Sequence, residues 1–218
     1  SMVVSEVSLG VDSNDEPLFN IEGYDLSTGT KRTITTQAGL TDAVNSFKIH
    51  NVDLYNDVPD DKKPKSDWMR ATKMLYLDKL NEYFITPIED IKKNDIIRYA
   101  SSDGQSTVSE LEVVMEYEKL KDCTNKVLYS VGDLPDSIFS TFRLEKVRID
   151  ACGDGRIKFY TNDVEEDLSL SDFRGKLIIS NNAIDTYLMS TAEGYIGSGE
   201  CAIVFSSAAD HYSIIVYK

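Results

Sequence analysis

The sequence predicts an α+β fold in which one central helix joins a small N-terminal unit to a larger β-rich region. Three observations support this class. Residues 17–58 combine extended runs with one short helical pattern, residues 66–84 carry the wide apolar arc of a packed helix, and from residue 88 short β-branched runs alternate with turn residues. The predicted domains are therefore 1–58, 59–87 and 88–218.

The N-terminal unit is predicted to be a β-β-α-β arrangement. Residues 18–24 form an extended run, and Ser27-Thr28-Gly29 is a turn because glycine tolerates a positive φ. Residues 31–37 are rich in threonine, a β-branched strand former. Thr41 is placed to cap a short helix, and residues 51–55 alternate as the last strand.

Residues 56–67 are the predicted linker, since their aspartates, lysines and prolines have almost no apolar surface to bury. The central helix follows, with Ser66 or Asp67 as its cap. Its apolar positions cover two adjacent sides, which is too wide an arc for a surface helix. These positions are Trp68, Ala71, Met74, Leu75, Leu77, Leu80 and Phe84.

The region from residue 88 is predicted to form a twisted antiparallel sheet or a partly closed barrel. Asp154-Gly155 is a type I′ hairpin signal between two strands. Residues 109–118 alternate as a strand, although Ser109 and Glu112 also resemble a helical capping box. Residues 183–189 are predicted as a short helix or turn. The expected strands cover 95–99, 109–118, 126–131, 144–151, 156–160, 176–180, 201–205 and 212–217.

Residues 93–99, Lys-Asn-Asp-Ile-Ile-Arg-Tyr, resemble the first strand of many small SH3-like barrels. The resemblance covers only this handful of residues, implies a strand there, and carries no functional site with it. It assigns the chain to no family.

Charge is distributed unevenly along the 218 residues, whose formal net charge is −14. Residues 1–30 and 177–217 contain no lysine or arginine. A chain with this balance repels nucleic-acid phosphate and anionic membranes at long range and attracts basic protein surfaces. We therefore expect a protein partner with a basic surface, or self-association, and no direct contact with nucleic acid or membrane.

Three widely spaced cysteines, Cys123, Cys152 and Cys201, favour reduced thiols over a disulfide framework. Ser1 before Met2 has the character of a cloning remnant, and the start has no signal-peptide pattern. No apolar run approaches the ~20 residues of a membrane span. These features predict a soluble, cytoplasmic protein.

One group of residues has the composition of a thiol nucleophile site. Cys201 would need the imidazole of His211, with Asp210 beside it, to form a thiolate. Cys201 opens a strand-like run, and His211 lies across an expected hairpin of unknown register. A small buried cysteine and a histidine in a surface turn explain the same residues more simply.

Cofactor and metal sites are not predicted. The glycines at 194, 197 and 199 precede a strand, whereas a phosphate loop needs a following helix. The acids near 12–16 and 150–154 do not match a calcium loop, and no CxxC or HxxxH pair suggests zinc.

Two sets of residues are candidate partner-binding positions. The acidic run Asp163, Glu165, Glu166 and Asp167 is either a solvated face or a docking surface for a basic partner. Tyr187, Tyr195 and Tyr212 belong to the stretch without basic residues, which is either core sheet or an interface rich in tyrosine. Alternation at 203–205 and 214–216 favours core.

The leading functional hypothesis is an acidic protein-binding or structural protein without catalytic activity. A sharper version is a decoy that competes with nucleic acid for a basic groove. Two alternatives remain: an assembly or virion-type structural subunit, and a cysteine-dependent hydrolase that uses Cys201 and His211.

Overall fold

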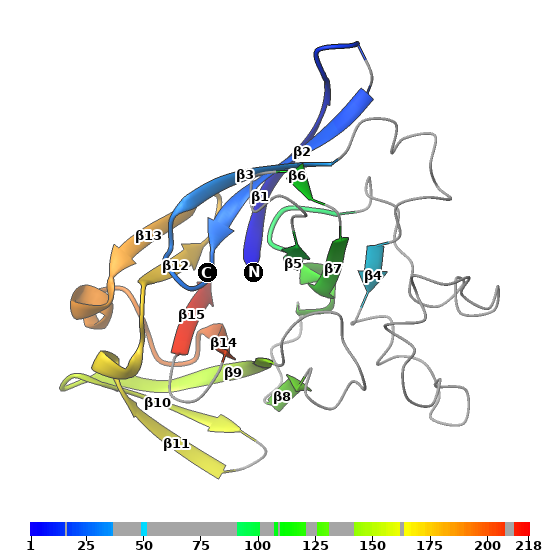
Figure 1. The fold of residues 1–218 in the computed structure, drawn as a ribbon. Coiled ribbons are helices and arrows are strands. Elements are labelled where there is room, and N and C mark those ends of the chain that lie inside the picture. Colours follow the sequence, from blue (N-terminus) through cyan, green and yellow to red (C-terminus); the bar gives the residue numbers. More distant parts are fainter. Residues whose placement is uncertain are drawn as a thin grey trace, which may run out of the picture. The chain divides into compact units, whose positions relative to one another are not determined.

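A computed structural model describes most of the two ends of the chain and parts of its middle. The described residues are 1–15, 17–36, 49–51, 91–100, 107–108, 110–120, 126–130, 142–161, 164–207 and 212–218. Every regular element among them is a β-strand or a short 3-10 helix (Figure 1). The α+β prediction is therefore wrong, and the described protein is all-β. The helices expected after Thr41 and over 66–84 lie outside the described residues.

The chain divides into two compact units. The first comprises Ser1–Tyr24, Lys31–Lys119 and Pro135–Phe139, and the second comprises Asp25–Thr30, Leu120–Leu134 and Ser140–Lys218. The predicted domain boundaries at 58 and 87 fall outside the described residues and stay a prediction.

A seven-stranded sheet carries the first unit, in the order β4-β7-β5-β1-β2-β3-β6. Its strands are β1 Met2–Val11, β2 Pro17–Asp25, β3 Lys31–Thr36, β4 Ile49–Asn51, β5 Ile96–Ala100, β6 Thr107–Val108 and β7 Glu110–Met115, and the 3-10 helix η2 Tyr117–Leu120 follows. The threonine-rich strand is confirmed. The strand predicted at 109–118 is confirmed over Glu110–Met115, whereas Tyr117 and Glu118 belong to η2. Strand β1 was not predicted, because the three consecutive apolar residues at its start, Met2, Val3 and Val4, hide the alternation.

An eight-stranded sheet carries the second unit. Seven strands follow the order β11-β10-β9-β14-β15-β12-β13, and β8 pairs with β9. The strands are β8 Lys126–Ser130, β9 Phe142–Gly153, β10 Arg156–Thr161, β11 Val164–Ser169, β12 Lys176–Ser180, β13 Ile184–Leu188, β14 Cys201–Ser207 and β15 Tyr212–Tyr217, with 3-10 helices η4 Leu170–Asp172 and η5 Met189–Gly194.

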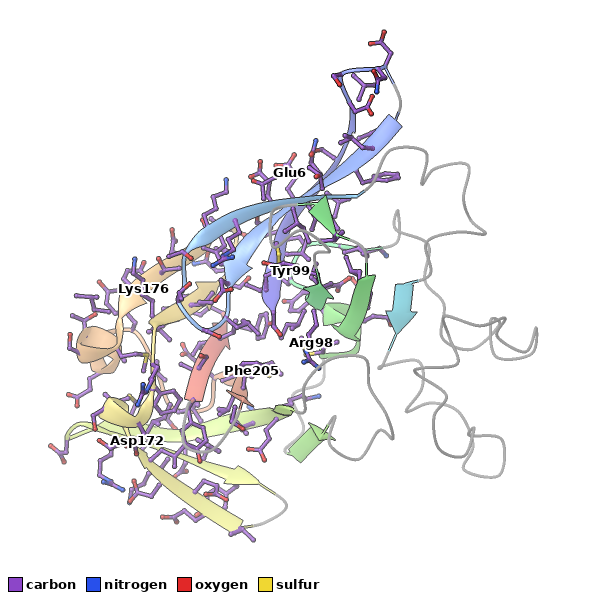
Figure 2. All side chains as sticks on the ribbon, viewed as in Figure 1. Glu6, Arg98, Tyr99, Asp172, Lys176 and Phe205 are labelled. Carbon is purple, nitrogen blue, oxygen red and sulfur yellow. The ribbon has the colours of Figure 1, made fainter. Side chains whose placement is uncertain are left out.

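The two C-terminal strands form the centre of this sheet. β14 pairs antiparallel with β15, which confirms the predicted terminal hairpin, and β15 pairs parallel with β12. Ala202 and Val204 belong to the hydrophobic core of the unit, and the alternate residues Ile203 and Phe205 are also buried. Phe205 is labelled in Figure 2. Burial on both faces explains the lack of lysine and arginine here, since ionised side chains are costly to bury.

The turn between β9 and β10 is the predicted type I′ hairpin. Asp154 and Gly155 both have positive φ values, 54° and 73°. The backbone N–H of Gly155 donates to Glu193 Oε1 in η5, and its carbonyl accepts from the N–H of Leu170 in η4. Both 3-10 helices therefore hold this turn.

One local prediction in the second unit is wrong. Residues 184–188 form strand β13 instead of a short helix or turn, and the helical turn η5 begins only at Met189. β13 pairs with β12 along its whole length, from Ser180 opposite Ile184 to Lys176 opposite Leu188. This pairing satisfies half of the backbone groups of β13 and outweighs the local preference of its residues for a helix or turn.

Candidate interaction surface

An aromatic pair lies at the last strand of the eight-stranded sheet. Tyr187 of β13 and Tyr195, just after η5, stack with ring centroids 3.9 Å apart and an interplanar angle of 25°. Tyr187 packs partly against the core, whereas Tyr195 is 37% exposed. The neighbouring Leu188 is 61% exposed. Successive side chains of a strand point to opposite faces, so Leu188 lies on the other face of β13 from the tyrosine stack. Tyrosine is enriched at protein interfaces.

The segment carrying Tyr195 is held by polar contacts from the C-terminal residue. Lys218 Nζ donates to the Tyr195 carbonyl and lies 3.1 Å from Glu200 Oε1. Glu200 also accepts the backbone N–H of Gly197 at 2.9 Å. At the start of η5, the Thr191 hydroxyl donates to the Leu188 carbonyl. The tyrosine pair is therefore supported at both ends of the connecting segment.

Tyr212, the third tyrosine candidate, has a different environment. It packs against the core cluster, with its ring centroid 5.7 Å from that of buried Phe173. The structure thus brings Tyr187 and Tyr195 together and places Tyr212 apart from them. Neither the stack nor this separation is visible in the sequence, since Tyr187 and Tyr195 meet only because η5 reverses the chain.

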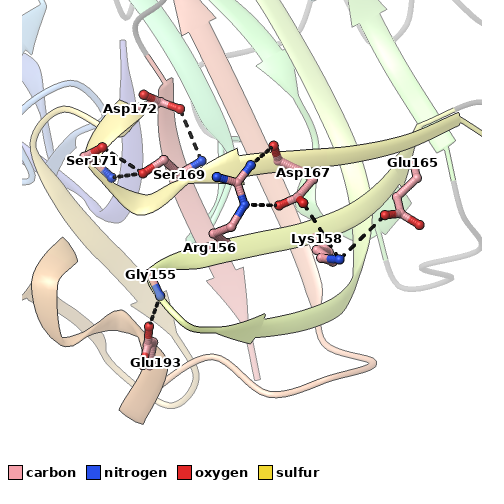
Figure 3. A network of polar contacts seen from close by, with 9 residues as sticks. All are labelled: Gly155, Arg156, Lys158, Glu165, Asp167, Ser169, Ser171, Asp172 and Glu193. Carbon is pink, nitrogen blue, oxygen red and sulfur yellow. Dashed lines mark hydrogen bonds and ion pairs between the residues drawn. The ribbon is translucent and has the colours of Figure 1, made fainter.

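The acidic candidates lie at the opposite edge of the same sheet, on β11. Antiparallel pairing sets Lys158 opposite Asp167 and Tyr160 opposite Glu165. Arg156 Nε lies 2.7 Å from Asp167 Oδ1, and its second nitrogen donates to the Asp167 carbonyl (Figure 3). Lys158 Nζ lies 3.8 Å from both Glu165 and Asp167.

These contacts reduce the negative charge that the acidic run presents to a partner. The ion pairs set two cations of β10 against Glu165 and Asp167, so this face of the hairpin has little net charge. Glu166 is half-buried on the other face, and Asp163 lies outside the described residues. The hydroxyl of Tyr160 donates to Glu165, which raises the pKa of Tyr160. A basic partner would have to displace these existing contacts.

The nucleophile candidates are not assembled among the described residues. Cys201 is disulfide-bonded, so the expectation of reduced thiols is wrong for this residue. Asp210 and His211 lie outside the described residues. Cys152 is a free thiol whose pKa is raised by burial and by the nearby Glu193 carboxylate. A raised pKa reduces the thiolate fraction, which is the reactive form.

One buried carboxylate with a strongly shifted pKa, Asp95, was missed by sequence reasoning. Burial raises the pKa of Asp95 from 3.8 to about 6, with Glu116 adding to the effect. Its two carboxylate oxygens accept the backbone N–H groups of Lys92 and Tyr117, each at 2.8 Å. Asp95 therefore joins the start of β5 to the end of β7. The asparagine before it was the signal that the sequence offered, since asparagine tolerates the left-handed backbone that Asn94 adopts (φ 75°) and so marks a turn before β5.

Among the described residues no three histidine, cysteine or acidic side chains are grouped to hold a metal ion. No helix in the described part of the chain is long and apolar enough to cross a membrane. Comparison with family models, curated proteins and solved structures found no match.

Proposed function

We propose that this chain is a non-catalytic protein-binding or structural protein that acts through protein–protein contacts. The observation that carries the proposal is the stacked pair Tyr187 and Tyr195, of which Tyr195 is exposed. Tyrosine supplies large, rigid contact area at low conformational cost, and it is enriched where proteins meet.

The charge of the chain supports a partner with a basic surface. A net charge of −14 steers cationic proteins toward it and keeps nucleic acid and anionic membranes away. The decoy version of this idea rests on the N-terminal acids, because the β11 carboxylates already have cationic neighbours. Glu6 and Asp15 are exposed in that N-terminal region.

Cytoplasmic location stays a prediction, and the disulfide at Cys201 argues against it because cytosolic thiols are normally kept reduced. Iodoacetamide labelling tests the thiol state directly. We expect the unfolded, unreduced protein to be labelled at Cys152 and to be labelled at Cys201 only after reductant is added.

The proposal is tested by affinity capture from cell lysate with the wild-type chain and two matched variants. Tyr195→Ala removes the exposed member of the stack, and Tyr160→Ala removes a similarly exposed tyrosine on β10. We expect a specific partner that Tyr160→Ala retains and Tyr195→Ala loses. Identical captures by all three proteins would contradict the proposal. Release of the partner at high salt would identify a basic surface, because salt screens exposed charges.

A further inference from the structure

We propose that β13 pairs antiparallel with β13 of a second copy of this chain, joining two eight-stranded sheets edge to edge. This inference deepens the proposed function, on which it rests, by naming the partner of the tyrosine-bearing edge.

The direction of the backbone groups of β13 can be derived from the hydrogen bonds of its neighbour β12. The N–H of Lys218 donates to the carbonyl of Ser180, so Ser180 directs its backbone groups toward β15. Backbone direction alternates along a strand, so Leu177 and Ile179 of β12 face β13. They pair with Tyr187 and Asp185, whose backbone groups therefore point into the sheet.

The remaining residues of β13 have the opposite direction. Ile184, Thr186 and Leu188 alternate with Asp185 and Tyr187, so their N–H and C=O groups point away from β12. The Leu188 carbonyl already accepts the Thr191 hydroxyl, which leaves one lone pair of this oxygen for a further donor. Strand β13 is last in the order of the described sheet. A strand with this arrangement is a template for another strand.

The strand is self-complementary when a second copy runs antiparallel about Thr186. Thr186 then faces its own equivalent, and threonine pairs are favourable across strands. Ile184 faces the exposed Leu188 of the other copy, which covers apolar surface. Asp185 faces Tyr187 of the other copy, so no two carboxylates are directly opposed. A parallel pairing would set Asp185 against Asp185 and is disfavoured.

The opposite edge does not have this property. An antiparallel copy of β11 centred on Glu166 would set Glu166 against its own equivalent and Glu165 against Asp167, so that carboxylates are directly opposed. Charged residues on an edge strand are a common protection against such pairing. β13 has one acid and no lysine, so the observations favour this edge for a second copy.

The dependence of binding on salt distinguishes a second copy of this chain from a partner with a basic surface. Two chains with a net charge of −14 repel each other, and salt screens that repulsion. Self-association through β13 should therefore strengthen as salt increases. Binding to a basic surface should weaken under the same change.

The test is sedimentation velocity of the full chain over roughly 10 μM to 1 mM, where small interfaces associate. We expect a monomer–dimer equilibrium that tightens with salt. Thr186→Pro removes an outward N–H that β12 does not use, and Leu188→Lys places a charge at the edge. Each should weaken association by roughly tenfold or more.

The matched control is Val164→Lys on β11, where the replaced side chain is 59% exposed. This variant should associate like wild type. A monomer at every concentration and salt would overturn the self-pairing while leaving a basic partner open to the capture experiment. Dimers that persist equally in Thr186→Pro and Leu188→Lys would also overturn it, since association would then use another surface.

Discussion

Strands β11 and β13, the first and last in the order of the described eight-stranded sheet, differ in the charge and the contacts of their residues. On β11 the side chains of Glu165 and Asp167 lie against lysine and arginine of β10. Pairing of β11 with a second copy of itself is disfavoured, because carboxylates would face each other. On β13 the outward backbone groups belong to uncharged residues, with stacked tyrosines beside them. The comparison teaches that charge content alone is a poor guide to a pairing edge. Under our proposal the acidic run disfavours pairing at β11, and the strand whose outward backbone groups belong to uncharged residues is the one that pairs with a second copy.

The largest expected effect is a loss of stability on substitution of Gly175, whose backbone conformation leads into the β12–β13 hairpin. Gly175 precedes β12 with φ 89°, and a Cβ there would meet the carbonyl of Ser27. Gly175→Ala should lower the free energy of unfolding by roughly 2–4 kcal/mol, because both strain and a backbone clash oppose it. Denaturant unfolding measures this.

The control is Gly153→Ala, since nothing lies within 4 Å of a Cβ at that position. It should change stability by less than about 1 kcal/mol. Equal losses in the two variants would show that the Gly175 conformation does not support the hairpin.

The second prediction compares a buried carboxylate that affects stability, Asp95, with an exposed carboxylate of β11, Asp167. The raised pKa of Asp95 means that the folded state holds a proton more tightly than the unfolded chain. The resulting stability is fully present below pH 3.8 and is lost as pH rises through about 6. Its size is roughly 2–3 kcal/mol.

Asp95→Asn should remove this dependence of unfolding free energy on pH, whereas Asp167→Asn on β11 should keep it. Unfolding curves at a series of pH values between 4 and 7 measure the slope. An unchanged slope in Asp95→Asn would assign the pH dependence to other groups.

A smaller effect is expected from the ion pairs of β11. Arg156 and Asp167 are 47% and 35% exposed, and exposed pairs contribute little. A double-mutant cycle with Arg156→Ala and Asp167→Ala should give a coupling energy below about 1 kcal/mol that falls with salt. A larger coupling energy that is independent of salt would mean that the pair of Arg156 and Asp167 contributes substantially to the stability of this edge.

The smallest effect concerns Tyr160. Its hydrogen bond to Glu165 raises the pKa of the phenol, so Glu165→Gln should lower that pKa toward its ordinary value. Titration of the Tyr160 ring by NMR follows the change. An unaltered titration would show that the phenol and Glu165 do not interact in solution.

Sequence reasoning succeeded where period-two alternation or turn chemistry dominates. Strand pairs such as β14 with β15, and the Asp154-Gly155 turn, carry these signals directly. β11 was missed because its acids obscure the alternation of a strand. β13 was misassigned because its residues have no strong local preference, and pairing with β12 decides their conformation.

The candidate surface could be predicted only in part. Tyr187 and Tyr195 were identified from composition, but their contact depends on η5, and Tyr212 has the same composition in a packed environment. The disulfide of Cys201 could not be deduced from three widely spaced cysteines, because spacing does not specify which thiols meet.

Amide hydrogen exchange along β13 tests the central claim most directly. The N–H groups of Ile184, Thr186 and Leu188 should exchange rapidly in dilute protein and become protected as concentration rises. Those of Asp185 and Tyr187, bonded to β12, should be protected throughout. Protection of the three outward amides that does not change with concentration, or no protection at any concentration, would contradict pairing through this edge.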